Sequence, residues 1–564
     1  MEKKPLPIGI EDFKEVIDLK YYFVDKTLMI KELIESQVKI GLFTRPRRFG
    51  KTLNMSMLQR FFEKTEESNA YLFDGLKIST YPAYMKYQGH YPVISISLKS
   101  MKQANFAESF DVFKELIRDE MLRHKNILFH SSAIEKTDLD KLTRFLELKA
   151  DKSDYNTSIC FLSKLLATAY NQKVIILIDE YDVPLENAFH QGFYTEMVNL
   201  IRSVFESALK TNASLDRAFL TGCLRVSRES IFTGLNNLQM FSIMSTKFDD
   251  SFGFTQEEID NVLEYYHLTN KSSDIKHWYD GYKFNDVEIY NPWSVLNYIS
   301  EAVEKDSVPC KPYWSNTSSN EIVKRLIEES NDRTKNTIEE LINGTPVRAQ
   351  IYEDVTYGTI DINSEYIWSF LLFTGYLKVI SYETVGDETY YNMVIPNTEI
   401  RSIYKNTIRA WFEKKINADS RTDILESIIH GEPEKLESLL RKWLLETISC
   451  HDEKESYYHG FVTGLVSGFA DYEVQSNVES GEGRFDLVIK QRSDAEYAAI
   501  LEFKIAKEFR DMSAKCDEAL KQIEEKKYIT TLKNELYRNV SKYGISFCKK
   551  RCQVKFGGTE KFVY

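Results

Sequence analysis

The sequence has no apolar run long enough to cross a membrane, and its first residues contain no apolar signal core. Cysteine is sparse, with seven residues in 564, and no pair has the spacing of zinc ligands. Basic residues are outnumbered, and the formal net charge of −12 argues against nucleic-acid binding by the charge of the whole molecule. We therefore expect a cytoplasmic protein with reduced thiols and no membrane partner.

A phosphate-binding loop is predicted at residues 44–52, whose sequence is TRPRRFGKT. The apolar run before it is typical of a buried strand, and residues 53–62 after it are typical of a helix. N–H groups at the start of such a helix can bind phosphate oxygens, Lys51 can reach the terminal phosphates, and the Thr52 hydroxyl can bind Mg²⁺. The usual motif starts with glycine where this chain has Arg45, and a basic turn before a helix is the alternative.

A second part of the same site is predicted at the end of residues 173–180, an apolar, β-branched run that ends in two carboxylates. In open α/β sheets, ligands bind at the carboxyl ends of the strands. We expect Asp179 to hold Mg²⁺ and Glu180 to orient or activate the attacking water. A solvated strand end is the alternative for these two acids taken alone.

These two stretches resemble the bacterial AAA-ATPase-like family, in which an arginine-rich loop without the first glycine is usual. Residues 220–222, 230–237, 278–282 and 290–294 resemble further blocks of that family. The resemblance covers about residues 5–400. It implies that Thr221, at the end of a strand, is a sensor of the terminal phosphate. Arg225 could neutralise phosphate charge, and an ordinary surface arginine is the alternative for this residue. The residues that we expect to bind nucleotide are Arg45, Arg47, Arg48, Phe49, Gly50, Lys51, Thr52, Leu53, Asp179, Thr221 and Arg225.

The last part of the chain carries a second chemistry. Two apolar strands are predicted at residues 485–489 and 498–504, and Asp486, Glu502 and Lys504 on them reproduce the D…E-x-K pattern. Residues two apart on a strand share a face, so Glu502 and Lys504 can act together with Asp486 around a divalent ion. The residues around them resemble the PD-(D/E)xK nucleases. Glu455 is a candidate third acid, and Gln522 matches a downstream glutamine of many members. We expect a domain with an intact site, and the alternative is a degenerate remnant of a nuclease.

The region between the two sites is predicted to be helical with one β-hairpin. Aromatic residues at 279–298 are expected to pack in a core rather than to stack on bases. Helix, hairpin and helix at residues 365–416 resemble a winged-helix module. This segment has no basic recognition helix, so we do not expect it to read a DNA groove. We thus predict a P-loop AAA-ATPase-like domain at 1–300, a helical and winged-helix-like lid at 301–416, a helical connector at 417–449 and a nuclease-like domain at 450–564.

The predicted fold class is α/β, with a parallel P-loop NTPase sheet, a helical extension and a C-terminal α/β restriction-endonuclease-like domain. The leading functional hypothesis is an ATPase, with ATP and Mg²⁺ as cofactors, that regulates a fused Mg²⁺-dependent nuclease acting on DNA. The resemblance suggests bacterial defence or mobile-element biology, and a homo-oligomer is compatible with it. The rival hypotheses are an ATP-dependent regulator whose nuclease fold only binds nucleic acid or protein, and a protein-remodelling ATPase without a nucleic-acid substrate.

Overall fold

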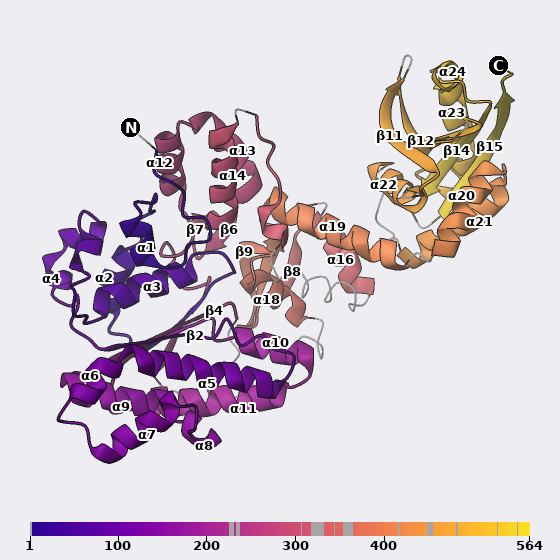
Figure 1. The fold of residues 1–564 in the computed structure, drawn as a ribbon. Coiled ribbons are helices and arrows are strands. Elements are labelled where there is room, and N and C mark those ends of the chain that lie inside the picture. Colours follow the sequence, from indigo (N-terminus) through magenta and orange to yellow (C-terminus); the bar gives the residue numbers. More distant parts are fainter. Residues whose placement is uncertain are drawn as a thin grey trace. The chain divides into compact units, whose positions relative to one another are not determined.

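The computed structural model divides into two compact units, residues 1–404 and residues 405–564 (Figure 1). The residues that the structure describes are 3–224, 231–232, 237–305, 307–316, 332–342, 344–353, 365–415, 418–447, 455–467, 469–480, 483–493, 495–526, 528–549 and 551–563. No helix in these ranges combines the length and the apolar character that a membrane span requires.

The N-terminal unit is built on a five-stranded parallel sheet. Its strands, in spatial order, are β2 (Val93–Ser97), β3 (Val174–Asp179), β4 (Leu215–Gly222), β1 (Ile40–Thr44) and β5 (Leu238–Phe241). Every residue of β1 and β3 is buried, which explains why these strands read as continuous apolar runs. Because all strands run the same way, the ends of β1, β3 and β4 meet at one edge, as the α/β prediction requires.

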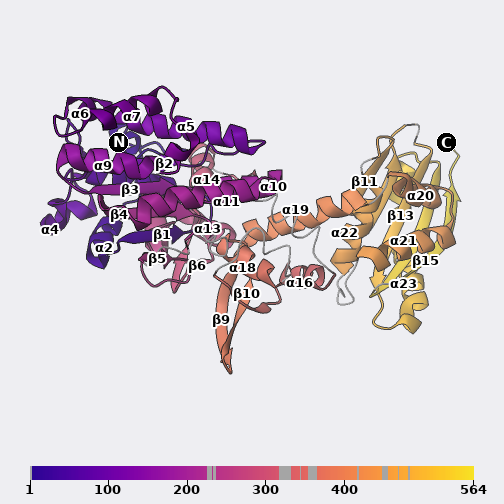
Figure 2. The same cartoon turned by 90° about the horizontal axis from the view of Figure 1, so that it is seen from below.

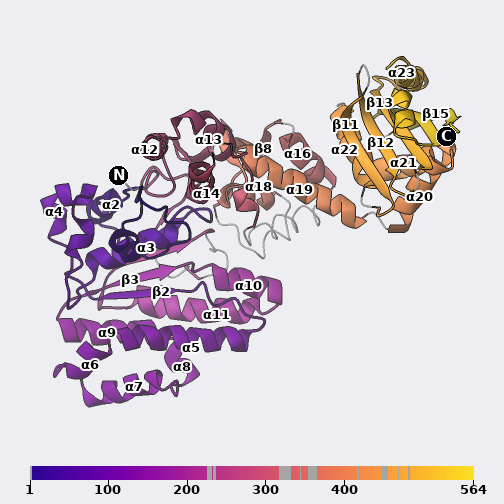
Figure 3. The ribbon, with the colours of Figure 1, turned by 45° about the horizontal axis from the view of Figure 1, so that its top comes forward.

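Helices cover both faces of this sheet (Figures 1 and 3). One face carries α1 (Phe13–Asp18), α2 (Leu28–Ser36) and α3 (Lys51–Phe62). The other carries α5 (Phe106–Arg123), α9 (Ser158–Tyr170), α10 (Val183–Gln191) and α11 (Tyr194–Phe205). Shorter helices lie at α4 (Pro82–Met85), α6 (Lys125–His130), α7 (Lys136–Leu146) and α8 (Lys152–Tyr155). The amphipathic helices thus bury a two-sided apolar sheet.

A helical subdomain follows the sheet. It contains α12 (Gln256–Tyr266), α13 (Ser272–Tyr279), the hairpin β6 (Tyr282–Phe284) and β7 (Val287–Ile289), and α14 (Pro292–Glu304). Tyr279, Tyr282, Tyr290 and Tyr298 are buried, as predicted for core aromatic residues. Trp293 is different, because it lines the pocket described below.

The remainder of the first unit holds a three-stranded antiparallel sheet, with β10 (Glu388–Val394) between β8 (Val347–Gln350) and β9 (Lys378–Val385). The helices next to it are α16 (Asp332–Ile342), α18 (Tyr366–Phe373) and α19 (Thr398–Lys415). The expected helix, hairpin and helix at 365–416 are therefore present, and Figure 2 shows the hairpin projecting from its neighbours. α19 is continuous across the sequence position that divides the two units.

The C-terminal unit is a mixed five-stranded sheet with helices on both faces. Its strands, in spatial order, are β11 (Tyr472–Ser480), β12 (Gly483–Gln491), β13 (Tyr497–Ile505), β14 (Asn539–Cys548) and β15 (Arg551–Lys561). Among these described strands, β13 and β14 pair in parallel and the other neighbours pair antiparallel. Its helices are α20 (Ala418–Ile429), α21 (Pro433–Thr447), α22 (Glu455–Val466), α23 (Met512–Glu525) and α24 (Tyr528–Asn534). This α/β unit completes the predicted fold class, which the structure confirms.

Helices α20 and α21 occupy the residues for which the sequence suggested a connector. Their buried side chains, including Leu440 and Trp443, belong to the same apolar core as Leu501 and Phe503 of the sheet. Tyr497 and Tyr543 donate hydrogen bonds from the sheet to the carbonyl oxygen of Ile428 in α20, over 2.7 and 2.6 Å. These helices are therefore part of the C-terminal unit.

Candidate functional sites

The predicted phosphate loop connects β1 to α3. Gly50 precedes the helix with a φ of +82°, a left-handed conformation that favours glycine. Lys51 begins the helix, and its Nζ donates hydrogen bonds across the loop to the carbonyl oxygens of Arg45 (3.0 Å) and Pro46 (2.9 Å). The ammonium group is therefore held against the loop that the sequence predicts to cradle phosphate.

A chain of hydrogen bonds joins the loop to the sheet edge. Thr52 donates its hydroxyl to Asp179 Oδ2 over 2.8 Å, and Thr221 at the end of β4 donates to Asp179 Oδ1. Burial raises the pKa of Asp179, and the two hydroxyl donors oppose that shift. The parallel sheet has brought together three side chains that are up to 169 positions apart in the sequence.

This donor set fits a magnesium ion, since Mg²⁺ in phosphate sites takes a hydroxyl and one or two carboxylates and keeps substrate phosphates and water as its other ligands. No group of three or more His, Cys, Asp or Glu side chains suited to a metal is found in the described ranges. Thr52 and Asp179 are thus the residues that would hold the ion at this site.

Glu180 has an uncommon backbone conformation. Its φ is +51°, which is uncommon for a residue other than glycine, and its N–H lies 3.5 Å from the Thr221 hydroxyl. Its side chain lines the pocket. Asp182, the alternative acid, is instead buried and accepts hydrogen bonds from the N–H groups of Cys223 (2.7 Å) and Leu224 (3.1 Å). Glu180 is the better placed of the two for water.

The three loop arginines differ in their surroundings. Arg45 is fully buried, and its guanidinium donates to the carbonyl oxygens of Phe241 (2.6 Å) and Phe248 (2.8 Å). Burial lowers its pKa to about 9. Arg45, which the sequence suggested as a nucleotide contact, therefore does not line the pocket. Arg47 pairs with Glu186 and lines the pocket.

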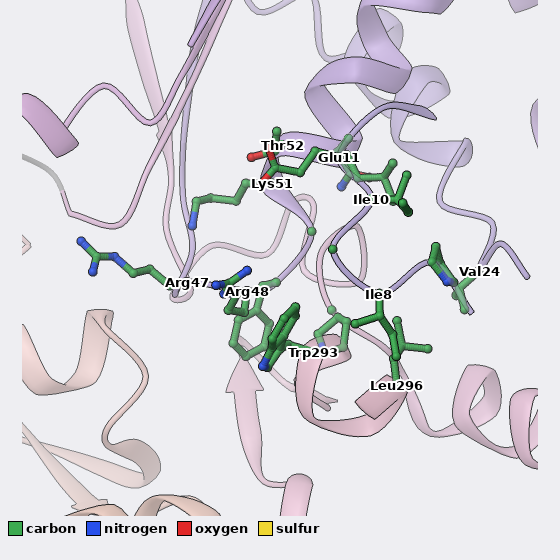
Figure 4. A pocket seen from close by; sticks show the side chains of 18 of the residues that line it. Ile8, Ile10, Glu11, Val24, Arg47, Arg48, Lys51, Thr52, Trp293 and Leu296 are labelled. Atoms are coloured by element: carbon green, nitrogen blue, oxygen red, sulfur yellow. The ribbon is translucent and has the colours of Figure 1, made fainter. Parts of the chain in front are cut away.

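Arg48 lies at the junction between the loop and α14. Its guanidinium stacks over the ring of Trp293 at 4.2 Å, and its φ is +69° (Figure 4). Both residues line the pocket. Phe49 is buried, packs on Tyr282 with ring centroids 5.0 Å apart, and also lines the pocket.

These groups line a cavity of about 450 Å³ whose two ends differ. The phosphate-loop end includes Lys51, Thr52, Leu53 and Glu180. The lining also has a large apolar part, which consists of Ile8, Phe23, Val24, Phe254, Trp293 and Leu296. In Figure 4, Ile8, Val24 and Leu296 gather away from Arg47. An apolar chamber joined to a cationic loop suits a nucleotide, with its base in the first and its phosphates at the second.

The sequence missed most of the apolar end. Ile8 and Leu296 are almost three hundred residues apart, and their segments meet only in the folded unit. Lys99 and Lys102 after β2 also line the cavity without a recognised motif. Arg225, predicted to neutralise phosphate charge, lies outside the described residues.

The second site lies where β12 and β13 separate. The paired register of the two strands ends at Leu487 and Leu501. Beyond it, Asp486 and Glu502 each accept a hydrogen bond from a backbone N–H of the other strand. Asp486 Oδ2 accepts a hydrogen bond from the N–H of Phe503 over 2.8 Å, and the N–H of Asp486 donates to Glu502 Oε2 over 3.4 Å. Asp486 and Glu502 are therefore neighbours on adjacent strands.

Glu502 is the centre of this cluster. Its Oε1 lies 3.4 Å from Lys504 Nζ and accepts a hydrogen bond from the side-chain amide of Gln522 on α23. Burial, and then the charge of Asp486, raises the pKa of Glu502 to about 7. Two adjacent carboxylates that repel one another in a buried place suit a divalent cation, so Asp486 and Glu502 fit the expected metal.

The remaining candidate acid, Glu455, is the first residue of α22, and its side chain lies outside the described part of the chain. His459 on the same helix has its Nε2 2.6 Å from the carbonyl oxygen of Asp486, which ties the helix to β12.

Comparison with known proteins finds matches in both parts of the chain. Residues 7–232 match the family described as Predicted AAA-ATPase, and residues 453–557 match the PD-(D/E)XK nuclease superfamily. The chain is 26% identical over 404 residues to an uncharacterized protein in the vnfD 5′ region of Azotobacter chroococcum mcd 1, which covers 71% of this chain and 69% of that protein. The chain therefore combines a domain of the predicted AAA-ATPase family with a domain of the PD-(D/E)XK nuclease superfamily.

Proposed function

We propose that the chain binds and hydrolyses ATP and thereby regulates its own Mg²⁺-dependent nuclease domain, which cuts DNA. The observation that carries this proposal is the assembly of two separate polar clusters from distant residues. Thr52 and Asp179 meet at one cluster, and Asp486, Glu502 and Gln522 meet at the other. The proposed setting is the bacterial cytoplasm, in defence or mobile-element biology.

At the ATPase site, the chain's own groups have separate roles. Lys51 exchanges its loop carbonyls for the terminal phosphates of ATP, and Thr52 and Asp179 hold the Mg²⁺. Glu180 orients the water that attacks the terminal phosphorus. When bound, the metal ion neutralises phosphate charge.

At the nuclease site, Asp486 and Glu502 hold the divalent ion, and Lys504 orients the attacking water or stabilises negative charge on the phosphate. Gln522 fixes the Glu502 carboxylate from α23. The metal ion supplies Lewis-acid activation of the scissile phosphate when it is bound.

A structural route for regulation starts at the pocket. Trp293 and Leu296 of α14 line the apolar end, and Ser294 between them donates its hydroxyl to the buried carboxylate of Glu399, 2.8 Å from Oε2. Glu399 lies in the first turn of α19 and also accepts a hydrogen bond from the N–H of Trp314 at 2.9 Å. A change in α14 on nucleotide binding would thus bias α19, which continues into the sequence of the second unit.

Glu399 gives this link a pH dependence. Burial raises the pKa of Glu399 from 4.5 to about 7, so the folded unit favours the protonated acid. The contribution of Glu399 to the stability of the folded unit is therefore fully present below about pH 4.5, and it is lost as the pH rises through 7. Replacing Glu399 by Gln should therefore increase the free energy of unfolding of the N-terminal unit relative to wild type by about 2 kcal/mol more at pH 8 than at pH 5. Chemical denaturation at several pH values measures this, with exposed Glu264→Gln as the control; parallel curves for wild type and Glu399→Gln would contradict it.

A cleavage panel tests the proposal as a whole. Purified full-length protein is incubated with single-stranded and duplex DNA, with Mg²⁺ or EDTA, and with or without ATP. We expect Mg²⁺-dependent cleavage whose rate responds to ATP. Binding without cleavage would favour the regulator whose nuclease fold only binds, and neither binding nor cleavage would favour the protein-remodelling ATPase.

A further inference from the structure

An exposed aromatic side chain lies beside the nuclease cluster. Phe509 follows Lys504 by five residues and is 48% exposed, although phenylalanine usually packs in a core. The guanidinium of Arg551, itself exposed, lies over its ring at 4.4 Å. Exposed single aromatic residues are common, so the location of this pair decides its meaning.

The strand register places Arg551 on the face that carries the catalytic cluster. Lys504 pairs with Ser546 on β14, and Ser546 pairs with Gln553 on β15, so these three side chains share a face. Cys548 and Arg551 are paired two residues further along and share it too. Arg551 is therefore at the same end of the sheet as Lys504, on the same side.

A small buried apolar cluster, Ala506, Met512 and Cys548, comes from the segments on either side of Phe509 and from the end of β14. The backbone there is fixed by the N–H of Ala506, which donates to the carbonyl oxygen of Phe547 over 2.8 Å. Phe509, in the short helix Phe509–Asp511, thus stands on a rigid base next to the cluster. A fixed ring loses little conformational entropy when a ligand stacks on it.

The charge of this region suits a nucleic-acid strand. Lys549 follows directly after β14 at this end of the sheet and is exposed. Lys507 is exposed between Lys504 and Phe509. Arg510, in contrast, is paired with Glu508 over 2.7 Å. Backbone phosphates can follow the cations while a base reaches the ring.

We propose that Phe509 and Arg551 form a stacking platform for an unpaired base of the strand that is cut. The substrate class is therefore DNA with a single-stranded or frayed segment at the cleavage site. A paired base in a continuous duplex cannot present its face to the ring, whereas every unpaired base can. This inference rests on the proposed nuclease function and names the form of its substrate.

Binding of oligonucleotides to the full-length protein in EDTA tests the platform without cleavage. The probes are a labelled oligothymidine, the same strand with abasic residues, and a blunt duplex. Wild type should bind oligothymidine about tenfold more tightly than the abasic strand. Phe509→Ala should remove this preference and Phe509→Trp should keep it, whereas binding of the blunt duplex should not change.

Two matched controls lie at the opposite end of β14. Leu536 is 59% exposed, and Lys533 stacks over the ring of Phe562 at 5.1 Å. Leu536→Ala and Lys533→Ala should both retain the preference for bases, and Arg551→Ala should weaken it. An unchanged preference in Phe509→Ala, or no preference in wild type, would overturn the platform. If wild type shows the preference but cuts no DNA with Mg²⁺, the nuclease proposal fails while the platform stands.

Discussion

Lys51→Ala is expected to lower the rate of ATP hydrolysis by about 10²–10³-fold, because removing one preorganised donor to a developing negative charge has an effect of this size. Lys51 is the first residue of α3, and its Nζ donates hydrogen bonds to two carbonyl oxygens of the loop. The neighbouring hydroxyl and backbone groups cannot supply a positive charge. Release of phosphate from ATP measures the loss, and binding of a labelled nucleotide should weaken in parallel.

Lys149→Ala is the control for this variant, since Lys149 is a surface residue paired only with Glu147 in the described chain. It should hydrolyse ATP at the wild-type rate. Both variants should keep the thermal transition of wild type. Unchanged turnover in a folded Lys51→Ala protein would show that the loop at residues 44–52 is not the ATPase site.

Glu502→Ala is expected to lower DNA cleavage at least 100-fold and to leave ATP hydrolysis within about twofold of wild type. The substitution removes a carboxylate that Asp486, Lys504 and Gln522 all contact. Asp486 alone would then have to hold the metal. Gel analysis of a labelled strand with Mg²⁺ measures cleavage, and phosphate release measures ATP hydrolysis on the same preparations.

Glu518→Ala is the matched control, because Glu518 lies on α23 like Gln522 but its side chain is half exposed and pairs with Lys515. It should cut DNA as wild type does. Full cleavage by Glu502→Ala would show that the D…E-x-K cluster is not the nuclease site. Loss of both activities in Glu502→Ala would indicate that the substitution disturbs more than the metal site.

The sequence was sufficient to predict the two polar clusters, because the residues of each lie at recognisable positions on apolar strands. Asp179 follows a continuous apolar run, and Glu502 and Lys504 are two apart on another. In the first unit the parallel strand direction brings the ends of β1, β3 and β4 together. In the second unit the antiparallel pairing of β12 and β13 brings Asp486 beside Glu502. A short motif and a rule of sheet geometry were enough.

The apolar end of the pocket could not be predicted in this way. Ile8 and Trp293 look like ordinary core residues, and only the packing of α14 against the N-terminal segment brings them to the nucleotide loop. Arg45 was misleading for a related reason. A loop arginine suggests a phosphate contact, but the carbonyl oxygens that bind it come from Phe241 and Phe248, about two hundred residues later.

The connector helices illustrate a third limit. The apolar faces of α20 and α21 are visible in the sequence, but an amphipathic helix does not state which core it covers. The structure places Leu440 and Trp443 in the core of the nuclease-like unit. These helices therefore belong to the C-terminal unit rather than to a separate connector.

The central claim is that nucleotide at the first site controls cleavage at the second. The most direct measurement is the rate of DNA cleavage by the full-length protein with and without ATP, in wild type, Lys51→Ala and Glu180→Gln. Glu180→Gln should bind ATP but hydrolyse it slowly, so it should hold the ATP-bound state. We expect a several-fold difference between ATP and no nucleotide in wild type, the same direction of change in Glu180→Gln, and no difference in Lys51→Ala. Equal cleavage rates with and without ATP, in wild-type protein that binds ATP and cuts DNA, would contradict the account.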